Sequence, residues 1–291
     1  MNPFIFILIF GFFKPGENSF TFLKNLKDAQ DIAMGEASVS LPPDVLSFLS
    51  NPSVLAEIKK YEFSFYSAFL WNNIKEEFVA YGGKTSYLGY CLSLNYLNYG
   101  EIQGRDTFGF KTQSFIPYDF AVHFGLGKDI SKFLKMGIAL GFASEKIEKE
   151  TGNSFLFSFG TNYILPKNPS FKFSFSFLNL GTKVKFMDES FFPPYVLKFG
   201  IFYHKLKTPY FFSGELCFPF DDIPYFSLGI AYNIMNILEI RSGFKSSFDT
   251  GFLSSLRFGF GLNFSFLNID YAIVPQGVLG FTHHVDLKFR F

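Results

Sequence analysis

Large apolar side chains recur at every second position through most of this sequence. Residues 171–177 alternate Phe with Lys or Ser, residues 258–266 alternate Phe or Leu with Gly, Asn or Ser, and residues 285–291 alternate Val, Leu or Phe with Asp, Lys or Arg. A period of two is the spacing of a β-strand whose two faces meet different surroundings. The pattern therefore predicts strands with one large apolar face and one small, polar or charged face.

The number of aromatic residues indicates where the apolar faces lie. The chain of 291 residues contains 46 Phe, and aromatic residues make up 21% of it. A soluble β-sandwich packs its apolar faces together and does not need Phe at nearly every such position. A barrel in lipid needs apolar side chains around its whole circumference, and its closure removes the unpaired strand edges that lipid does not tolerate. We therefore expect an all-β fold, a transmembrane antiparallel β-barrel in the outer membrane of a Gram-negative (diderm) bacterium.

About fourteen segments carry the strand pattern, an even number as bacterial barrels require. They lie near residues 61–70, 75–82, 84–99, 114–128, 134–148, 154–165, 171–180, 195–205, 209–218, 225–234, 237–245, 252–266, 267–274 and 278–291. Gly82-Gly83 predicts a hairpin between the second and third strands. Breakers at 166–169, 192–194 and 221–224 separate later strands. The polar, glycine-containing residues 100–113 are interpreted as an extracellular loop.

The first 60 residues do not follow the strand pattern. Residues 4–13 form an apolar run of about ten residues, whereas a membrane-spanning helix needs about 20. The run fits the apolar core of a secretory signal, so we expect residues 1–19 to be a signal peptide. Residues 20–60 contain Pro42-Pro43 and no sustained period of two. We expect them to fold into the lumen as a short plug, and residues 61–291 to form the barrel.

Three ordered motifs run through the chain. The first comprises residues 20–24 (FTFLK), 34–37 (MGEA) and 51–55 (NPSVL), the second residues 178–185 (LNLGTKVK), and the third residues 269–291, which include IDYAIVP and end in KFRF. Together they resemble the signatures of the PorV/PorQ family of outer-membrane proteins. The acidic run that usually precedes the Asn-Pro motif of this family is replaced here by SLPPD.

The resemblance implies a fold and a role. It implies a fourteen-stranded barrel similar to the fatty-acid transporter FadL, with its N-terminus folded into the lumen. Some members of the family receive proteins that are exported by the type IX secretion system. The motif residues of the plug are here Met34, Gly35, Asn51 and Pro52, and we assign them a structural role.

The C-terminus ends on an aromatic residue that follows alternating apolar steps. Leu287, Phe289 and Phe291 have the spacing of a barrel-assembly signal, and closure of the last strand seals the barrel. On the same strand, His283 and His284 are expected to point to opposite faces, so they cannot share a metal ion.

Charged residues on the lumen faces of the strands allow two interpretations. Lys172, Arg257, Asp286, Lys288 and Arg290 are expected inside the barrel, where buried charges need partners. They either pair with one another and keep a polar lumen folded, or they anchor the plug and contact a ligand.

The sequence predicts no catalytic, cofactor-binding or metal site. It contains no Gly-x-Ser-x-Gly elbow and no His-Glu-x-x-His pair. Its two cysteines, Cys91 and Cys217, lie far apart and are expected to be unpaired thiols on the lumen side. A formal net charge of +1 argues against a nucleic-acid partner. We expect a non-enzymatic protein without a cofactor, whose partners include outer-membrane lipid and the barrel-assembly machinery.

Three functions remain open. The first is a PorV/PorQ-like role in binding or handling secreted or surface proteins, with residues 191–194 and 218–220 as candidate apolar contact surfaces. The second is a FadL-like channel for hydrophobic small molecules, with a pocket between plug and wall lined by Met34, Leu41 and Val45 and a lateral opening in a strand. The third is a structural barrel with no ligand.

Overall fold

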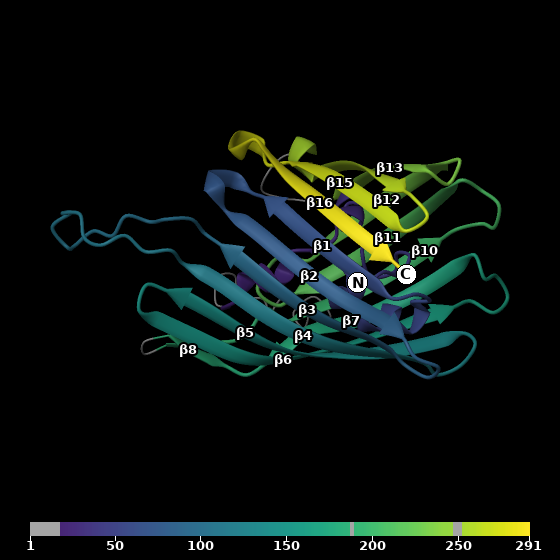
Figure 1. Cartoon of the computed structure of the whole chain (residues 1–291), viewed down its shortest axis with the longest axis horizontal. Coiled ribbons are helices and arrows are strands. Elements are labelled where there is room, and N and C mark those ends of the chain that lie inside the picture. The colour runs from purple at the N-terminus through teal and green to yellow at the C-terminus, as the bar shows by residue number, and fades with distance from the viewer. Residues whose placement is uncertain (1–17, 187–188, 247–251) are drawn as a thin grey trace, which may run out of the picture.

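Strands form a closed antiparallel barrel in the computed structural model, which describes residues 18–186, 189–246 and 252–291. Each strand pairs with its neighbours in chain order, and β16 pairs with β1 to close the barrel (Figure 1). The fourteen strands are β1 (Glu62–Phe69), β2 (Lys75–Lys84), β3 (Gly89–Asn98), β4 (Tyr118–Asp129), β5 (Leu134–Ile147), β6 (Glu150–Ile164), β7 (Phe171–Gly181), β10 (Val196–Tyr203), β11 (Tyr210–Pro219), β12 (Tyr225–Ile234), β13 (Leu238–Lys245), β14 (Leu256–Asn263), β15 (Leu267–Pro275) and β16 (Phe281–Arg290). The predicted antiparallel β-barrel is confirmed.

The two faces of each strand follow the alternation in the sequence. On β16, Thr282, His284, Asp286 and Lys288 are buried in the lumen, whereas His283 on the outer face is exposed. Exposed Phe, Leu, Ile and Tyr side chains cover the outside of the other strands. An apolar exterior around a polar lumen is the arrangement that a barrel in lipid requires.

The two ends of the barrel have connections of different length. Residues 85–88, 130–133, 165–170 and 235–237 are short turns at one end, which we call the inner end. At the other end, the outer end, residues 99–117 form a long ribbon that projects well beyond the barrel (Figure 1). Bacterial barrels place their short turns in the periplasm and their long loops outside the cell.

Three details of the predicted strands were wrong. Gly82-Gly83 is not a hairpin, because β2 continues to Lys84 and the turn follows at residues 85–88. The predicted strand 252–266 begins with a 3-10 helix, η5 (Phe252–Ser255), and only Leu256–Asn263 is extended. A small hairpin of β8 (Val184–Phe186) and β9 (Glu189–Phe191) at the outer end was not predicted.

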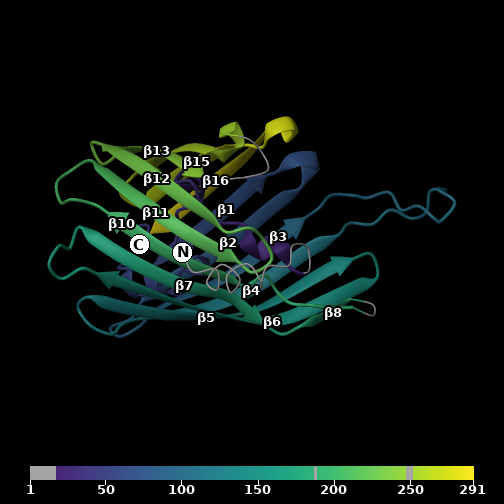
Figure 2. The same cartoon turned by 180° about the vertical axis from the view of Figure 1, so that it is seen from behind.

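Residues 18–60, which we call the N-terminal segment, occupy the lumen (Figures 1 and 2). The segment contains 3-10 helices η1 (Thr21–Lys24), η2 (Ser47–Leu49) and η3 (Pro52–Glu57) and the short α-helix α2 (Ala29–Ala33). It starts at the outer end, where Asn18 forms a bridge with Phe192, and reaches the inner end before β1. Residues 1–17 of the predicted signal peptide lie outside the described residues. None of the helices in the described ranges is long and apolar enough to cross a membrane.

Glycines recess the barrel wall where the N-terminal segment touches it. Gly125, Gly127, Gly137 and Gly160 of β4–β6 face residues 48–56, and Gly200, Gly229, Gly243 and Gly259 of β10–β14 face residues 33–40. A Cβ atom at any of these positions would lie within 3 Å of an atom of the segment. Glycine is the residue that lets a backbone or ligand approach a strand so closely, so the inner wall is shaped to the segment.

Candidate functional site

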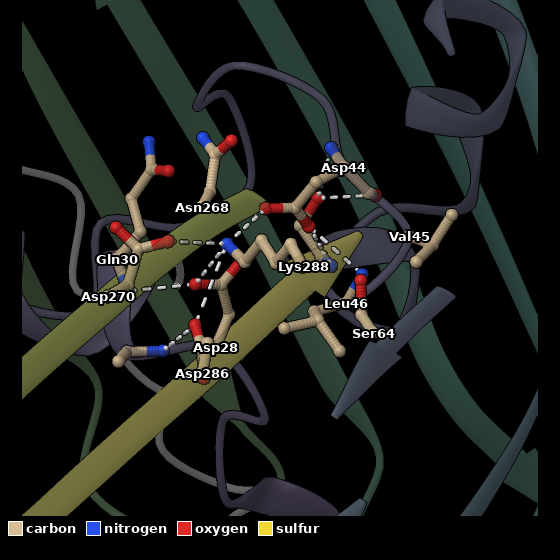
Figure 3. A network of polar contacts seen from close by, with 12 residues as sticks. Asp28, Gln30, Asp44, Val45, Leu46, Ser64, Asn268, Asp270, Asp286 and Lys288 are labelled. Atoms are coloured by element: carbon tan, nitrogen blue, oxygen red, sulfur yellow. Dashed lines mark hydrogen bonds and ion pairs between the residues drawn. The ribbon is translucent and has the colours of Figure 1, made fainter. Parts of the chain in front are cut away.

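Lys288 of β16 is the centre of a buried ionic cluster that joins the N-terminal segment to the wall (Figure 3). Its Nζ lies 3.1 Å from Asp28 Oδ1 and 2.5 Å from Asp44 Oδ2, both on the segment. It also lies 3.2 Å from Asp270 Oδ2 and 3.5 Å from Asp286 Oδ2, on the wall. We call these five residues the Lys288 cluster.

The Lys288 cluster contains more carboxyl groups than one ammonium can neutralise. Arg241 Nη1 binds Asp270 at 2.6 Å and supplies a second cation. Burial and the neighbouring carboxylate of Asp44 raise the pKa of Asp28 to about 7, although Lys288 opposes this effect. Although burial alone would raise the pKa of Asp44, the ammonium of Lys288 holds it below its usual range. Like charges at this separation cannot all ionise, so the carboxyl group of Asp28 is partly protonated near neutral pH.

Further wall residues bind backbone groups of the N-terminal segment. Glu215 Oε2 accepts hydrogen bonds from the backbone N–H groups of Ser38 and Val39, each at 2.8 Å. Lys172 Nζ donates to the carbonyl oxygen of Leu41 at 3.0 Å. These charges anchor the segment as well as pairing with one another, and their contact with a ligand stays a prediction.

Met34 and Gly35 lie where the N-terminal segment turns along the wall. Met34 ends α2 and packs with Leu41 and Phe211. Gly35 has a φ of 73°, a left-handed backbone that favours glycine, and a Cβ atom there would lie 2.6 Å from the Phe244 nitrogen. Position 35 therefore requires glycine, both because of its backbone conformation and because the wall leaves no space for a side chain.

Asn51 and Pro52 begin η3 and fasten it to the opposite wall. Asn51 Oδ1 accepts from the backbone N–H of Ser53, an N-cap, and Pro52 occupies the first turn. Asn51 Nδ2 donates to Asn162 Oδ1 of β6 and to the carbonyl oxygen of Val39, both at 2.8 Å. Asn51 therefore connects two parts of the segment with the barrel.

The C-terminal apolar residues lie on the outside of the barrel seam. Leu287 pairs with Phe65 and Phe289 with Phe63 across the β1–β16 ladder. Phe291 follows β16, and its side chain is 71% exposed. The position of all three residues is known, and their role as an assembly signal stays a prediction.

A cavity of about 480 Å³, the outer cavity, lies between the N-terminal segment and the outer half of the wall. Much of its lining is apolar and comes from both sides: Leu23, Leu26, Leu70, Trp71, Ile74, Leu97, Leu178, Val196 and Val274. At its edge β7 bulges, because the register with β6 shifts between Phe157 and Phe159 and Asn179 adopts a φ of 62°. The sequence motif around Asn179 gave no sign of this bulge.

Four lysines line the outer cavity, and each one has a carboxylate partner. Lys24 binds Asp221, Lys27 binds Glu76, Lys198 binds Glu215 and Lys245 binds Glu36, with N–O distances of 2.7, 2.6, 2.9 and 2.7 Å. Burial raises the pKa of Glu36, but Lys245 and Arg257 outweigh it and hold that pKa at about 2. The cations are therefore already neutralised, and the cavity offers a solute mainly apolar surface.

A second cavity of about 470 Å³, the inner cavity, opens at the inner end beside β10–β13. Its lining includes Pro42 of the N-terminal segment, Phe202 of β10, Phe211 of β11 and Glu239 of β13. The prediction that Met34, Leu41 and Val45 line a pocket was wrong. Met34 and Leu41 pack against Phe211 and Ala231, and Val45 belongs to the main apolar cluster of the segment.

The histidines and cysteines occupy separate positions in the barrel wall. His284 Nδ1 lies 2.9 Å from the Tyr66 hydroxyl in the lumen, whereas His283 binds Tyr271 on the outside, so the two histidines point to opposite faces as predicted. Cys91 and Cys217 are buried free thiols. No group of three or more His, Cys, Asp or Glu residues within the described ranges could hold a metal ion.

Comparison with known proteins gives a match of structure without a match of sequence. No family model and no curated protein matches the chain. The toluene transporter TodX of Pseudomonas putida is similar with a TM-score of 0.65 and 13% identity, over 94% of this chain and 97% of that chain. The toluene transporter TbuX of Ralstonia pickettii is similar with a TM-score of 0.66 and 11% identity, over 92% of this chain and 99% of that chain.

A third similar structure is a FadL homologue of Pseudomonas aeruginosa, with a TM-score of 0.58 and 10% identity, over 91% of this chain and 98% of that chain. The chain has a FadL-like barrel fold. This confirms the FadL-like part of the family resemblance at the level of fold. The narrower PorV/PorQ assignment finds no support in these comparisons and stays a prediction.

Proposed function

We propose that this protein is an outer-membrane channel that takes up neutral hydrophobic small molecules. The observation that carries the proposal is the outer cavity, whose surface is mainly apolar and whose four lysines are all paired. An apolar site of a few hundred cubic ångströms is the usual form of a small-molecule site. Transport of toluene by TodX and TbuX, which have a similar fold, agrees with a neutral solute.

The proposal includes the placement of the parts of the chain. Residues 1–19 act as the export signal, residues 20–60 act as the plug, and residues 61–291 form the barrel in the outer membrane of a diderm bacterium. The apolar exterior supports the membrane location, and the anchoring of residues 28–51 to the wall supports the plug. The channel role needs no catalytic group.

Trp71 provides a direct test, because it lines the outer cavity and is the single tryptophan of the chain. We expect toluene to change the fluorescence of Trp71 in the purified protein in a saturable way. Dodecanoate, an anionic amphiphile, should bind more weakly because each lysine is already paired. The absence of any saturable change with toluene would refute the proposal.

A pair of valines gives a matched control for this titration. Val196 lines the outer cavity, whereas Val122 of β4 lies on the outer face of the barrel. Val196→Phe fills part of the cavity and should weaken toluene binding by about tenfold, the effect of a poorly accommodated apolar group. Val122→Phe makes the same change in side-chain volume on the lipid side and should leave binding unchanged.

The long ribbon favours a second candidate function, the PorV/PorQ-like handling of secreted or surface proteins. Its tip exposes Phe108 and Phe110, which are 86% and 72% accessible. Exposed aromatic side chains at the end of an extended arm are typical of a protein contact. The apolar surface predicted at residues 218–220 is less available, because Phe220 stacks on Phe177 and makes an edge-to-face contact with Tyr195.

This second function is tested by shortening the ribbon. Replacement of residues 103–112 by a short Gly-Ser turn removes the exposed tip and leaves β3 and β4 unchanged. If the protein handles secreted proteins, a stoichiometric partner will co-purify with the native chain and not with the shortened chain. Toluene binding at Trp71 should be equal in both chains, which separates the two functions.

A further inference from the structure

On strands β10–β13 the outer and the inner cavity lie at opposite ends of the wall, although the outer cavity also reaches β1–β3, β7, β15 and β16. Along β10 the outer cavity is lined by Val196 and Lys198, and the inner cavity by Phe202. Along β11 the corresponding residues are Cys217 for the outer cavity and Phe211 for the inner cavity. Strands β12 and β13 repeat the arrangement: Tyr225 and Lys245 line the outer cavity, and Asn233 and Glu239 line the inner cavity.

Small residues lie on much of the wall between the two cavities. On β10 and β12 these are Gly200, Ser227 and Gly229, on β11 they are Ser213 and the larger Glu215, and on β13 Gly243 lies beside the large Arg241. Residues 38–41 of the N-terminal segment cover this stretch at β10 and β11, with Val39 and Ser40 against Gly200. Met34 and Gly35 cover it at β12 and β13, where they lie against Gly229 and Gly243.

Several buried hydroxyls in this stretch have no partner. Ser40, Ser213 and Ser227 are at most 5% exposed, and the hydroxyl of each finds no hydrogen-bond partner among the described residues. Buried polar groups are normally satisfied by protein or by water. Hydroxyls of this kind between two cavities are groups that water can bind, as are the unpartnered atoms of Ser93, Asn95 and His123 on β3 and β4.

We propose that a solute passes from the outer to the inner cavity along β10 and β11, and that residues 38–41 form the barrier that must move to let it pass. This inference rests on the proposed channel function and adds the route and its barrier. Glu215 holds the barrier against the wall, because its carboxylate accepts hydrogen bonds from the backbone N–H groups of Ser38 and Val39. Lys198 strengthens this attachment, because it binds Glu215 at 2.9 Å and the Ser38 hydroxyl at 3.1 Å.

Ion conductance across a planar bilayer tests the route without any hydrophobic solute. Glu215→Gln keeps the side-chain shape and removes the charge that holds residues 38 and 39. Loss of charge-assisted hydrogen bonds shifts a two-state equilibrium by about tenfold. We therefore expect the conductance, averaged over time, to rise by about this factor.

Glu62 of β1 supplies the matched control. Its Oε1 accepts the backbone N–H of Val45 at 3.0 Å, so it is also a wall carboxylate that holds the same segment, but on another side of the barrel. Glu62→Gln should leave the conductance at the native level. An equal rise in both variants would mean general loosening of the segment and would overturn the proposed route.

A reversible cross-link supplies the second measurement. A Cβ atom at Gly200 would lie 3.3 Å from Ser40 Cβ, close to the roughly 3.5 to 4.5 Å that a disulfide needs. We would add Ser40→Cys and Gly200→Cys to the Glu215→Gln variant, with Cys91 and Cys217 replaced by serine. Val39→Ala is added to every chain of this series, because the new Cβ at position 200 would otherwise lie 2.2 Å from Val39 Cγ1. Oxidation should abolish the added conductance and a reductant should restore it.

Conductance tests the barrier, and toluene binding at Trp71 tests the channel function separately. If the oxidised cross-link leaves the conductance of the Glu215→Gln chain unchanged, residues 38–41 are not the barrier. Toluene binding at Trp71 does not depend on the barrier, so it should persist in the cross-linked protein. Loss of that binding in the native chain would instead remove the channel function itself.

Discussion

Gly35 of the N-terminal segment lies against Gly243 of β13, so closely that neither residue has room for a Cβ atom. At Gly243 the obstructing atoms are backbone atoms of Met34 and Gly35, and at Gly35 they are backbone atoms of Leu228 and Phe244, which cannot rotate away as a side chain can. Each of the two positions therefore requires glycine.

Gly243→Ala should lower the stability of the protein. Overpacking of a tight interior contact typically costs about 1–3 kcal/mol, and here the added methyl group pushes the segment off the wall. Thermal unfolding in detergent would measure the loss. Gly214→Ala on β11 is the control, because its nearest atoms are side-chain carbons of Ile201 and Leu228 at 3.3 and 3.6 Å. Equal melting temperatures for both variants would contradict the close fit.

Lys288→Met should release the N-terminal segment from the wall. The substitution keeps the apolar stem but leaves the carboxyl groups of the Lys288 cluster without their shared cation. Removal of one partner from a buried ion pair costs about 3–5 kcal/mol. Limited proteolysis within residues 28–44 would report the release. Lys135→Met provides the comparison, because Lys135 pairs with the half-exposed Asp129 and its loss should cost less than about 1 kcal/mol.

Asp28 and Asp44 should respond differently to removal of their charge. The pKa of Asp28 in the folded protein is raised to about 7, above an unfolded value of about 4. The native state therefore holds a proton that the unfolded state releases, so the stabilisation is complete below about pH 4 and is lost as the pH rises toward about 7. Asp28→Asn should weaken this pH dependence. Asp44→Asn should destabilise the protein, because the charge of Asp44 binds Lys288.

The melting temperature measured across this pH range checks both substitutions. The expected result for Asp28→Asn is a flatter curve with near-native stability at neutral pH. If Asp28→Asn were as harmful as Asp44→Asn, both carboxyl groups would have to be ionised in the folded state.

Asn51→Ser should distinguish the contribution of the helix cap from the contribution of the hydrogen bonds to Asn162 and Val39. Serine can still cap η3, but it cannot reach both Asn162 and the Val39 carbonyl. Loss of these two hydrogen bonds should cost about 1–3 kcal/mol. Chemical denaturation would measure the change. Stability equal to that of the native protein would show that the cap alone explains the requirement for asparagine.

Phe291→Ala tests the predicted assembly signal. Phe291 is largely exposed and lies at the end of the seam, so we expect slower insertion in cells with an unchanged melting temperature of the assembled barrel. Phe266→Ala is a matched control, because Phe266 is also exposed, at 61%, in a turn at the same end. Insertion at the native rate in the Phe291 variant would argue against the signal.

The barrel could be predicted from the sequence because the information is local. Each strand needs alternation only over its own length, and residues 171–177 or 285–291 show the pattern without reference to any other part of the chain. The error at Gly82-Gly83 has a physical reason. Gly82 faces Val45 of the N-terminal segment, so its lack of a side chain serves a contact inside the lumen rather than a turn.

The cavities could not be predicted, because they depend on residues that are far apart in sequence. Val196 and Leu23 line one cavity only because the N-terminal segment lies in the lumen at one particular height. A usable signal was nevertheless present. Gly125 and Gly127 lie at lumen-facing positions of β4, and Gly229 and Gly243 lie at lumen-facing positions of β12 and β13. Glycines that recur at lumen-facing positions of several strands indicate that a segment packs against the inner wall of the barrel.

The direction of the N-terminal segment constrains how this molecule can be made. Its start lies at the outer end beside Phe192, and its end joins β1 at the inner end. Since β1 is also half of the closing seam with β16, the segment is tethered to the strand that closes the barrel. It can enter the lumen across the open sheet before the seam forms, or through the inner end afterwards. In either order, Lys288 faces a lumen without its two aspartates of the segment until the segment has entered.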